Sequence, residues 1–353
     1  MRSFGAPAIP WPGNVGKFPR RAEAPRHNAG DEVNAMEKVL QVSFPVVLSA
    51  LFCWCAANPQ AGAQAPQKEK VILDTDIGGD IDDAYALSLA LSSPELEVLG
   101  VCVNTGAVEQ RAKIALKMLH EAGRDDIPVA VGLPGPRKDK RPNQYPYAQD
   151  YEATKPIDEN AVEFLARMLN NSNGDITVIA YGPLSNIAAL VEKHPMAAKR
   201  MKRLIIMGGM CGVGALAGRE VFPEYNVRCD VPASQTVFRA GLPLTMITLD
   251  VTLLCKLTKP YQQRFEKSQR PLAQAMVKLL DLWPGKIPTL HDPLAVVYSY
   301  APQFIEVKPY HVVVDDQGRT IIVQGKEPNC NVSVTVQAEK FLDFFCDRVA
   351  GPN

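Results

Sequence analysis

Short apolar runs alternate with longer amphipathic segments along the chain from residue 70 onward. The apolar runs end at polar or turn-forming residues, which favours buried β-strands. The amphipathic segments carry apolar residues three or four positions apart, which favours helices with one face in a core. The pattern predicts strands at 71–73, 96–103, 129–131, 176–180, 204–207 and 244–247, and helices at 82–91, 108–120, 161–169, 183–194 and 232–240.

This order of elements predicts an α/β fold, because two parallel strands need a crossover helix that packs back on the sheet. We expect a mostly parallel, Rossmann-like sheet flanked by helices, with functional residues at the carboxyl ends of the strands. The Pro-, Lys- and Arg-rich segment 133–157 predicts a long loop, and the apolar residues 311–314 and 320–323 predict a small C-terminal β-hairpin. Residues 66–353 contain no obvious linker and are expected to form one domain.

Residues 1–65 differ from the rest of the chain in composition. Residues 1–35 are rich in Pro, Gly, Ala and Arg, whereas residues 44–57 form an uncharged apolar run. That run is shorter than the roughly 20 residues that a membrane-spanning helix needs. Two triplets of the small-x-small type, 61–63 and 63–65, follow it, as they do in secretory signal peptides.

The N-terminal pattern therefore predicts a signal peptide that starts at Met36 and ends at Ala63 or Ala65. Cleavage after Ala63 is favoured, because Pro66 is a poor residue directly after a cut. With a signal peptide the protein is periplasmic or secreted, and without one it is cytoplasmic. An uncleaved anchor or a disordered tail is the alternative interpretation, and no stable membrane insertion is expected.

Charge and cysteine content narrow the function classes. The 353 residues include 38 Lys and Arg and 38 Asp and Glu, so the net charge is 38 − 38 = 0. Nucleic-acid binding as the main task would need clustered basic residues, so it is not expected. None of the eight cysteines has zinc-ligand spacing, which predicts buried free thiols. In an exported protein some of them could pair, and the sequence leaves the pairing open.

Five aspartates follow the first predicted strand within ten residues: Asp74, Asp76, Asp80, Asp82 and Asp83. Carboxylates this close repel one another unless a cation lies among them, and oxygen ligands suit calcium or magnesium. The glycines at 78 and 79 allow the sharp bend that such convergence needs. A capped helix N-terminus is the alternative, but capping needs one or two acids rather than five.

Six segments, in order, carry a resemblance to a known family. Residues 71–90 resemble the signature of the inosine-uridine preferring nucleoside hydrolases, with a strand, Asp-x-Asp, a glycine turn and Asp-Asp-Ala. The other segments that are similar to family motifs are Gly-Pro-Leu-Ser-Asn-Ile-Ala within 180–188, Met-Gly-Gly at 207–209, Glu-Tyr-Asn at 224–226, Leu-Asp-Val-Thr at 249–252 and His-Asp-Pro-Leu-Ala at 291–295. The match extends over about residues 70–351.

The resemblance implies the nucleoside hydrolase fold and hydrolysis of the N-glycosidic bond of ribonucleosides to ribose and free base. It implies a calcium ion held by Asp76, Asp83, Asp292 and the main-chain carbonyl of Tyr181, with Asp76 activating a metal-bound water. His291 would protonate the leaving base. The residues implied in substrate binding are Asp82, Asn104, Met207, Glu224, Asn226 and Asp292. The implied partner is a small nucleoside, and related proteins form homodimers or homotetramers.

The chain departs from the family pattern in two places. The turn between Asp76 and Asp82 is two residues longer, which leaves open whether Asp80 takes the role given to Asp82 or Asp83. The second strand is followed by Gly-Ala where the family often has Gly-Asn or Gly-Asp, so Asn104 is the candidate substitute. The base preference stays open.

Two other functions compete with nucleoside hydrolysis. A strand that ends in Asp-x-Asp also resembles the haloacid dehalogenase phosphohydrolases, but the Ser or Thr and Lys that bind phosphate there have no obvious counterpart, and His291 would have no role. A non-enzymatic, calcium-dependent module that binds nucleosides or sugars is the second alternative.

Overall fold

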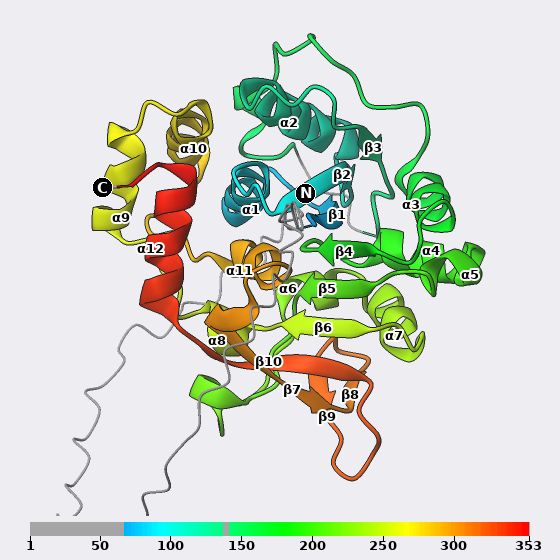
Figure 1. Ribbon diagram of the computed structural model, residues 1–353. Helices are drawn as coiled ribbons and strands as arrows, with labels where there is room; N and C mark the ends of the chain where they lie inside the picture. The colour runs from blue at the N-terminus through cyan, green and yellow to red at the C-terminus, as the bar shows by residue number, and fades with distance from the viewer. Residues whose placement is uncertain (1–66, 137–140, 353) are drawn as a thin grey trace, which may run out of the picture. The chain divides into compact units, whose positions relative to one another are not determined.

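The computed structural model describes residues 67–136 and 141–352 (Figure 1). In this part of the chain, eight strands form one sheet in the order β3-β2-β1-β4-β5-β6-β10-β7, and only β7 runs antiparallel to its neighbour. The strands are β1 (Glu69–Thr75), β2 (Leu96–Val103), β3 (Val129–Val131), β4 (Ile176–Ala180), β5 (Arg203–Met207), β6 (Leu244–Ile247), β7 (Ile305–Tyr310) and β10 (Cys330–Val336).

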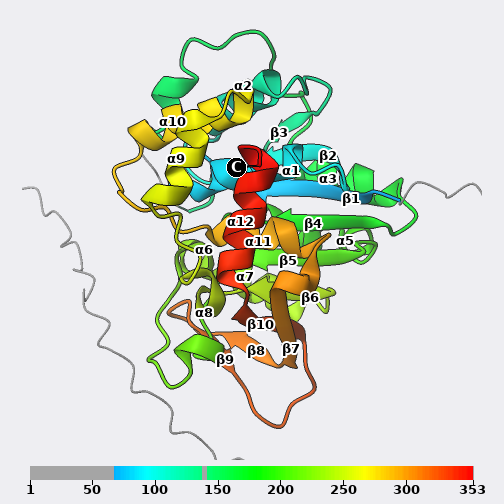
Figure 2. The same cartoon turned by 60° about the vertical axis from the view of Figure 1, so that its left-hand side comes forward.

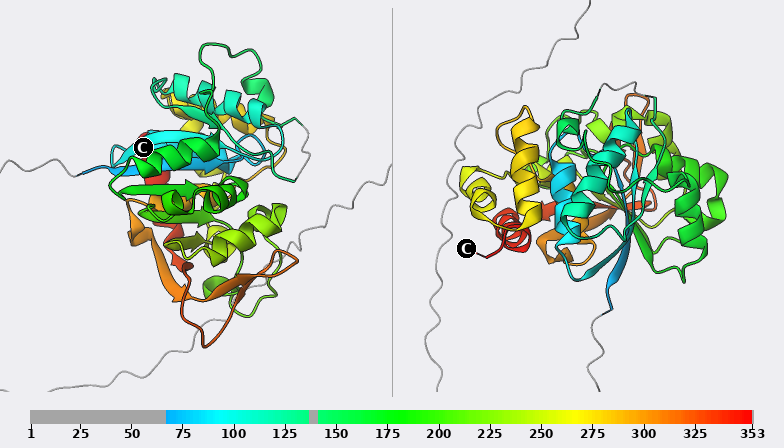
Figure 3. Two further views of the ribbon diagram at one scale, coloured as in Figure 1. Left: turned by 90° about the vertical axis from the view of Figure 1, so that its right-hand side faces the viewer. Right: turned by 90° about the horizontal axis from the view of Figure 1, so that it is seen from above.

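Helices cover both faces of the sheet (Figures 1 and 3). The helices are α1 (Asp82–Leu91), α2 (Val108–Glu121), α3 (Ala161–Asn170), α4 (Ser185–Lys193), α5 (Pro195–Ala198), α6 (Tyr225–Cys229), α7 (Val231–Arg239), α8 (Leu249–Thr252), α9 (Lys259–Lys267), α10 (Pro271–Leu282), α11 (His291–Tyr298) and α12 (Ala338–Val349). None of the described helices is both long and apolar enough to cross a membrane.

The core has two layers because successive strand residues point to opposite faces of the sheet. Val71 and Leu73 of β1 pack in the layer with α1, α2, α10, α11 and α12. Ile72 between them packs in the other layer, with α3, α4, α5 and α7. Both layers are made of buried, mostly aliphatic and aromatic side chains, so the central strands are shielded from water on both sides.

The predicted α/β fold with a mostly parallel sheet is confirmed, and so is the hairpin, which is formed by β8 (Val312–Val314) and β9 (Thr320–Ile322) and lies beside β7 in Figure 2. The helix predicted at 183–194 is shorter and begins at Ser185. The long loop at 133–157 contains the short 3-10 helix η1 (Tyr145–Tyr147). The predicted signal peptide lies outside the described residues. All six described cysteines are buried, and Cys102, Cys211, Cys255, Cys330 and Cys346 are free thiols, as predicted.

The direction in which strands are added to the sheet reverses between β1 and β4. From β1 the chain builds outward through β2 and β3, and it then returns to add β4 on the other side of β1. In open α/β sheets, ligands bind at the carboxyl ends of the two strands that flank such a reversal. Here Tyr181 N, just after β4, donates to Asp74 O at 2.8 Å, so the ends of β4 and β1 meet at that point.

Candidate active site

Three buried carboxylates converge where two helices begin beside the end of β1. Asp82 and Asp83 open α1, and Asp292 lies in the first turn of α11. Their carboxylate oxygens lie within 4.8 Å of one another, and Asp292 N donates to Asp82 Oδ2 at 3.3 Å. The pKa of each of these carboxyls is well above its usual value, because burial and then the neighbouring charges disfavour ionisation. A buried, all-oxygen group of this kind suits a hard divalent cation.

Asp76 and Tyr181 belong to the same end of the sheet. Asp76 is buried, and its charge contributes to the raised pKa values of Asp83 and Asp292. Tyr181 follows β4, and its carbonyl accepts a hydrogen bond from Asn226 Nδ2 at 3.1 Å. The four predicted metal ligands therefore gather in one region, and Asp82, which was assigned to the substrate, lies among them.

Thr75, which the sequence analysis did not single out, joins β1 to α1. Its hydroxyl donates to Asp83 Oδ1 at 2.5 Å and accepts from Ile77 N at 3.1 Å. The side chain thus fixes one Asp83 oxygen relative to the turn that follows β1. Its position between the two aspartates of the Asp-x-Asp motif was the available signal.

Asp74 is held by amide side chains. Its two oxygens accept from Asn104 Nδ2 at 3.1 Å and Asn186 Nδ2 at 2.7 Å. Burial raises the pKa of Asp74 to about 7, although the two amides favour its charged form. Asn104 also accepts from the Thr105 hydroxyl at 2.7 Å, so both ends of this predicted substrate ligand are engaged within the protein. Asn186, which lies in the quoted Gly-Pro-Leu-Ser-Asn segment, was not identified as a site residue.

Glu224 and Asn226 connect the ends of β4 and β5. Glu224 caps α6 by accepting from Asn226 N at 2.9 Å and Val227 N at 3.2 Å, and it also accepts from Gly209 N at 2.9 Å. Burial raises the pKa of Glu224, and these backbone donors oppose the shift. Asn226 Nδ2 donates to the carbonyls of Tyr181 and Met207, the latter at 3.2 Å. The Asn226 side-chain oxygen has no such structural partner in the described part of the chain.

His291 is the first residue of α11 and lies next to Asp292. Its Nδ1 is 2.7 Å from the hydroxyl of Thr252, at the end of α8. Burial lowers the pKa of His291 to about 4, so the ring is neutral near pH 7. When Thr252 donates to Nδ1, the single ring proton resides on Nε2 and can be donated to another group.

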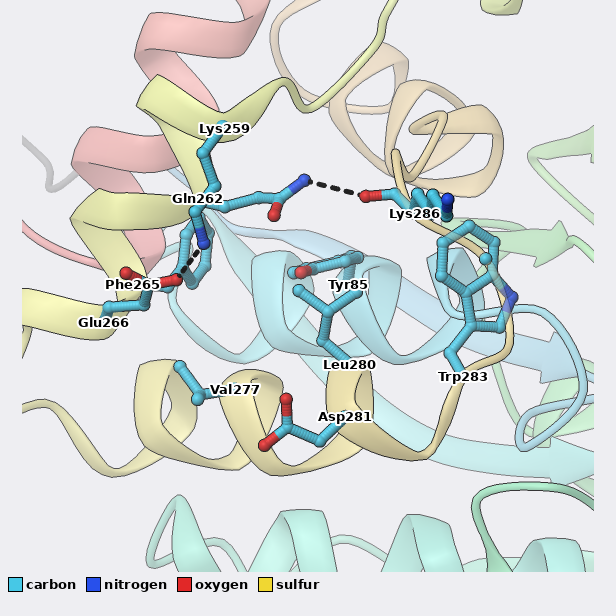
Figure 4. A pocket seen from close by; sticks show the side chains of 11 residues that line it. Tyr85, Lys259, Gln262, Phe265, Glu266, Val277, Leu280, Asp281, Trp283 and Lys286 are labelled. Carbon is cyan, nitrogen blue, oxygen red and sulfur yellow. Dashed lines mark hydrogen bonds and ion pairs between the residues drawn. The ribbon is translucent and has the colours of Figure 1, made fainter.

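Asp80 is not one of the three converging carboxylates, although its charge contributes to the raised pKa of Asp82. It is exposed, and it accepts from Ile81 N at 2.7 Å and from the indole of Trp283. Trp283 also lines a cavity of about 310 Å³, together with Tyr85 of α1 and side chains of α9 and α10 (Figure 4). Between the alternatives for the longer turn, the geometry places Asp82 and Asp83, rather than Asp80, beside Asp292.

The chain is similar to known proteins over most of its described length. The sequence profile of the inosine-uridine preferring nucleoside hydrolases matches residues 71–343. The chain is 30% identical to the pyrimidine-specific ribonucleoside hydrolase RihA of Citrobacter koseri, over 79% of this chain and 97% of that protein. Two similar solved structures are a plant nucleoside hydrolase, PpNRh1 (TM-score 0.72, 27% identity, 80% of this chain and 99% of that one), and a purine-preferring ribonucleoside hydrolase from Gardnerella vaginalis (TM-score 0.69, 28% identity, 80% and 98%).

Proposed function

The chain belongs to the inosine-uridine preferring nucleoside hydrolase family and hydrolyses ribonucleosides, and we propose that it does so with a calcium ion at the end of β1. The observation that carries the metal proposal is the buried group of Asp82, Asp83 and Asp292. The proposed ligands are Asp76, Asp83, Asp292 and the carbonyl of Tyr181. A calcium ion bound there neutralises the carboxylates and lowers the pKa of a water that it coordinates.

In the proposed reaction, the oxygen of the attacking water forms a bond to the anomeric carbon of the ribose, and Asp76 accepts a proton from that water. The bond between this carbon and the base nitrogen breaks, and its electron pair leaves with the base. As in other glycosidic cleavages, the sugar passes through a state with oxocarbenium character. Asp76 is suited to the role of general base because it is buried beside the other carboxylates at the carboxyl end of β1.

The proposed ribose ligands are Asp82, Glu224, Asn226 and Asp292. Asn104 and Met207 are proposed as further substrate-binding residues. Glu224 and Asn226 are already fixed by main-chain hydrogen bonds, so little side-chain entropy is lost when they bind the sugar hydroxyls. The free oxygen of the Asn226 side chain is the atom available to accept from a hydroxyl. Binding the hydroxyls orients the anomeric carbon toward Asp76 and the water.

His291 is the proposed proton donor to the leaving base. A neutral imidazole that receives a hydrogen bond from Thr252 presents its only N–H at Nε2. As the Nε2 proton passes to the base nitrogen, the Thr252 hydroxyl proton passes to Nδ1, so the imidazole stays neutral and the base leaves uncharged; the proton that Asp76 took from the water is returned through solvent to Thr252. The released base would then be available to purine or pyrimidine salvage.

A nucleoside panel tests the proposed function. Base release from uridine, cytidine, inosine, adenosine and guanosine is measured with calcium and with a chelator. We expect release with calcium, little with chelator, and loss on Asp76→Asn. Asp175→Asn is the matched control. Asp175 forms an ion pair with Lys70 where β1 and β4 begin, which is the end of these strands away from the candidate site. Phosphate release from a generic ester would favour the phosphohydrolase, and binding without turnover would favour the non-enzymatic module.

We also propose that the protein is exported and assembles as a homodimer or homotetramer. The apolar run at 44–57 and the small-x-small triplets after it support export. N-terminal sequencing of the protein from an expressing cell would give Gln64 as the first residue if cleavage follows Ala63. Light scattering after size-exclusion chromatography would measure the assembly.

A further inference from the structure

The turn that carries Asp76 and leads into α1 has every one of its main-chain carbonyls bound. Arg111 Nη1 donates to the carbonyls of residues 76 and 77, the latter at 2.9 Å. Gln144 N donates to the carbonyl of residue 78 at 3.2 Å, and Gln144 Nε2 donates to those of residues 79 and 80 at 3.3 and 2.8 Å. The carbonyl of residue 81 accepts from Tyr85 N as α1 begins.

Arg111 joins this turn to the next strand end. It lies on α2 and is 3% exposed, and its Nε donates to Thr105 O at 2.6 Å. Thr105 follows β2 and has a positive φ of 67°, an uncommon conformation for a residue with a side chain. A guanidinium donates in several fixed directions at once, so one side chain can hold the backbone after β1 and after β2 together.

Gln144 approaches the turn from the long loop before η1. Its side chain is fully buried, and its partners lie 64 and 65 residues earlier in the chain. The turn packs closely against this loop and against α2. Gly78 has a φ of +106°, and a Cβ added there would lie 2.6 Å from Ile114 and 3.0 Å from Pro142. The backbone is thus enclosed by α2 and the loop, and Arg111 and Gln144 bind its polar groups.

We propose that Arg111 and Gln144 are positioning residues for the nucleoside hydrolase site. They hold the turn after β1 so that Asp82 and Asp83 stay beside Asp292, close to the charge of Asp76, before a cation binds. The inference rests on the proposed calcium-dependent function. Carboxylates this close repel one another, and the turn that joins Asp76 to Asp82 is five residues long and contains two glycines. Hydrogen bonds from a charged guanidinium to the carbonyls are among the stronger ones available to oppose that repulsion.

Two variants test the proposal with readouts beyond stability. Arg111→Lys keeps the charge but loses the planar fork, and Gln144→Leu removes the amide but keeps the main-chain bond to residue 78. For each, calorimetry gives the calcium dissociation constant, steady-state kinetics give kcat and KM, and thermal unfolding is followed in chelator. Residues that orient metal ligands typically change metal affinity or activity by about 10–100-fold when replaced. We expect a change of this size in calcium affinity and kcat, with a much smaller change in KM.

Gln274→Leu is the matched control. It also removes an amide that donates to a main-chain carbonyl, that of Ser268 just before α10. We expect it to change the unfolding temperature alone. If Arg111→Lys fails to fold, Gln144→Leu decides the question. Variants that only unfold at lower temperature, with wild-type calcium affinity and kcat, overturn the proposal, whereas an unaltered protein that neither binds calcium nor releases base overturns the proposed function instead.

Discussion

Removal of calcium should make the stability of the protein fall as the pH rises, because of the group formed by Asp82, Asp83 and Asp292. Their oxygens lie within 4.8 Å of one another. At that separation two unit charges repel by roughly 3 kcal/mol for an effective dielectric constant of about 20, so three ionised carboxylates cost on the order of 10 kcal/mol. The whole stability of a domain is about 5–15 kcal/mol. The calcium-free protein must therefore keep part of this group protonated.

The sign of the pH effect follows from the direction of the shifts. Burial and neighbouring charges raise the pKa of all three carboxyls in the folded protein. In the unfolded chain they ionise near the ordinary value of about 3.9. Above that pH the folded, calcium-free protein binds more protons than the unfolded chain. Its free energy of unfolding therefore falls as the pH rises from about 4 through the raised pKa values.

Calcium should reduce this pH dependence, since it replaces the protons. Thermal unfolding at pH 5 to 8 in chelator and in calcium measures both slopes, and about 2.7 kcal/mol of stabilisation is expected at 100 times the dissociation constant. Calorimetry in two buffers of different ionisation enthalpy should show proton release on calcium binding, greatest at the acidic end. Asp175→Asn should leave both slopes unchanged, because this carboxyl is near the surface and Lys70 lowers its pKa. A pH-independent unfolding temperature in chelator, or calcium binding without proton release, would refute the reasoning.

Three further predictions concern single residues. His291→Ala should lower kcat for uridine by about 10²–10⁴-fold and have much less effect on p-nitrophenyl riboside, whose leaving group needs no proton; equal losses on both substrates would contradict the role. Gly78→Ala should cost about 1–3 kcal/mol of unfolding free energy in urea titrations, more than Gly218→Ala, which has a positive φ but open space around it. Asn186→Leu should cost about 1–3 kcal/mol by the same assay, because it leaves a buried Asp74 oxygen without its 2.7 Å partner.

Strands β1 to β6 could be predicted from the sequence because they are joined by successive strand–helix–strand units. Strands β1 to β6 are apolar runs separated by amphipathic helices, and the right-handed crossover rule then fixes their parallel packing. The position of strand β10 in the sheet could not be predicted in this way. This strand comes late in the chain, after β7 and the hairpin, yet it lies between β6 and β7 in the sheet. Only tertiary packing decides such an insertion, and periodicity carries no signal for it.

The candidate site divides in the same way. Residues with a proposed chemical role, such as Asp76 and His291, lie in motifs and could be picked out from the sequence. Residues that hold the motifs in place could not. Arg111 resembles an ordinary polar residue of a helix, and Gln144 lies in a loop without any pattern. Their partners are backbone carbonyls, which are the same for every residue type, so no complementary side chain in the sequence reveals the contact.

The arrangement of Glu224 and Asn226 shows why motif and fold are hard to separate at this site. Each side chain forms hydrogen bonds with the main chain. Glu224 accepts from three backbone N–H groups, and the Asn226 amide donates to carbonyls at the ends of β4 and β5. In the proposed complex, the remaining oxygen lone pairs would accept from sugar hydroxyls without a rearrangement of either side chain. Replacement of either residue should therefore remove a proposed substrate contact and also the hydrogen bonds that hold the segment after β5. A loss of activity in such a variant would have two possible origins. Because the Tyr181 carbonyl is a proposed calcium ligand, a measured fall in calcium affinity would identify the loss of the structural hydrogen bonds, and an unchanged affinity would identify the loss of the substrate contact.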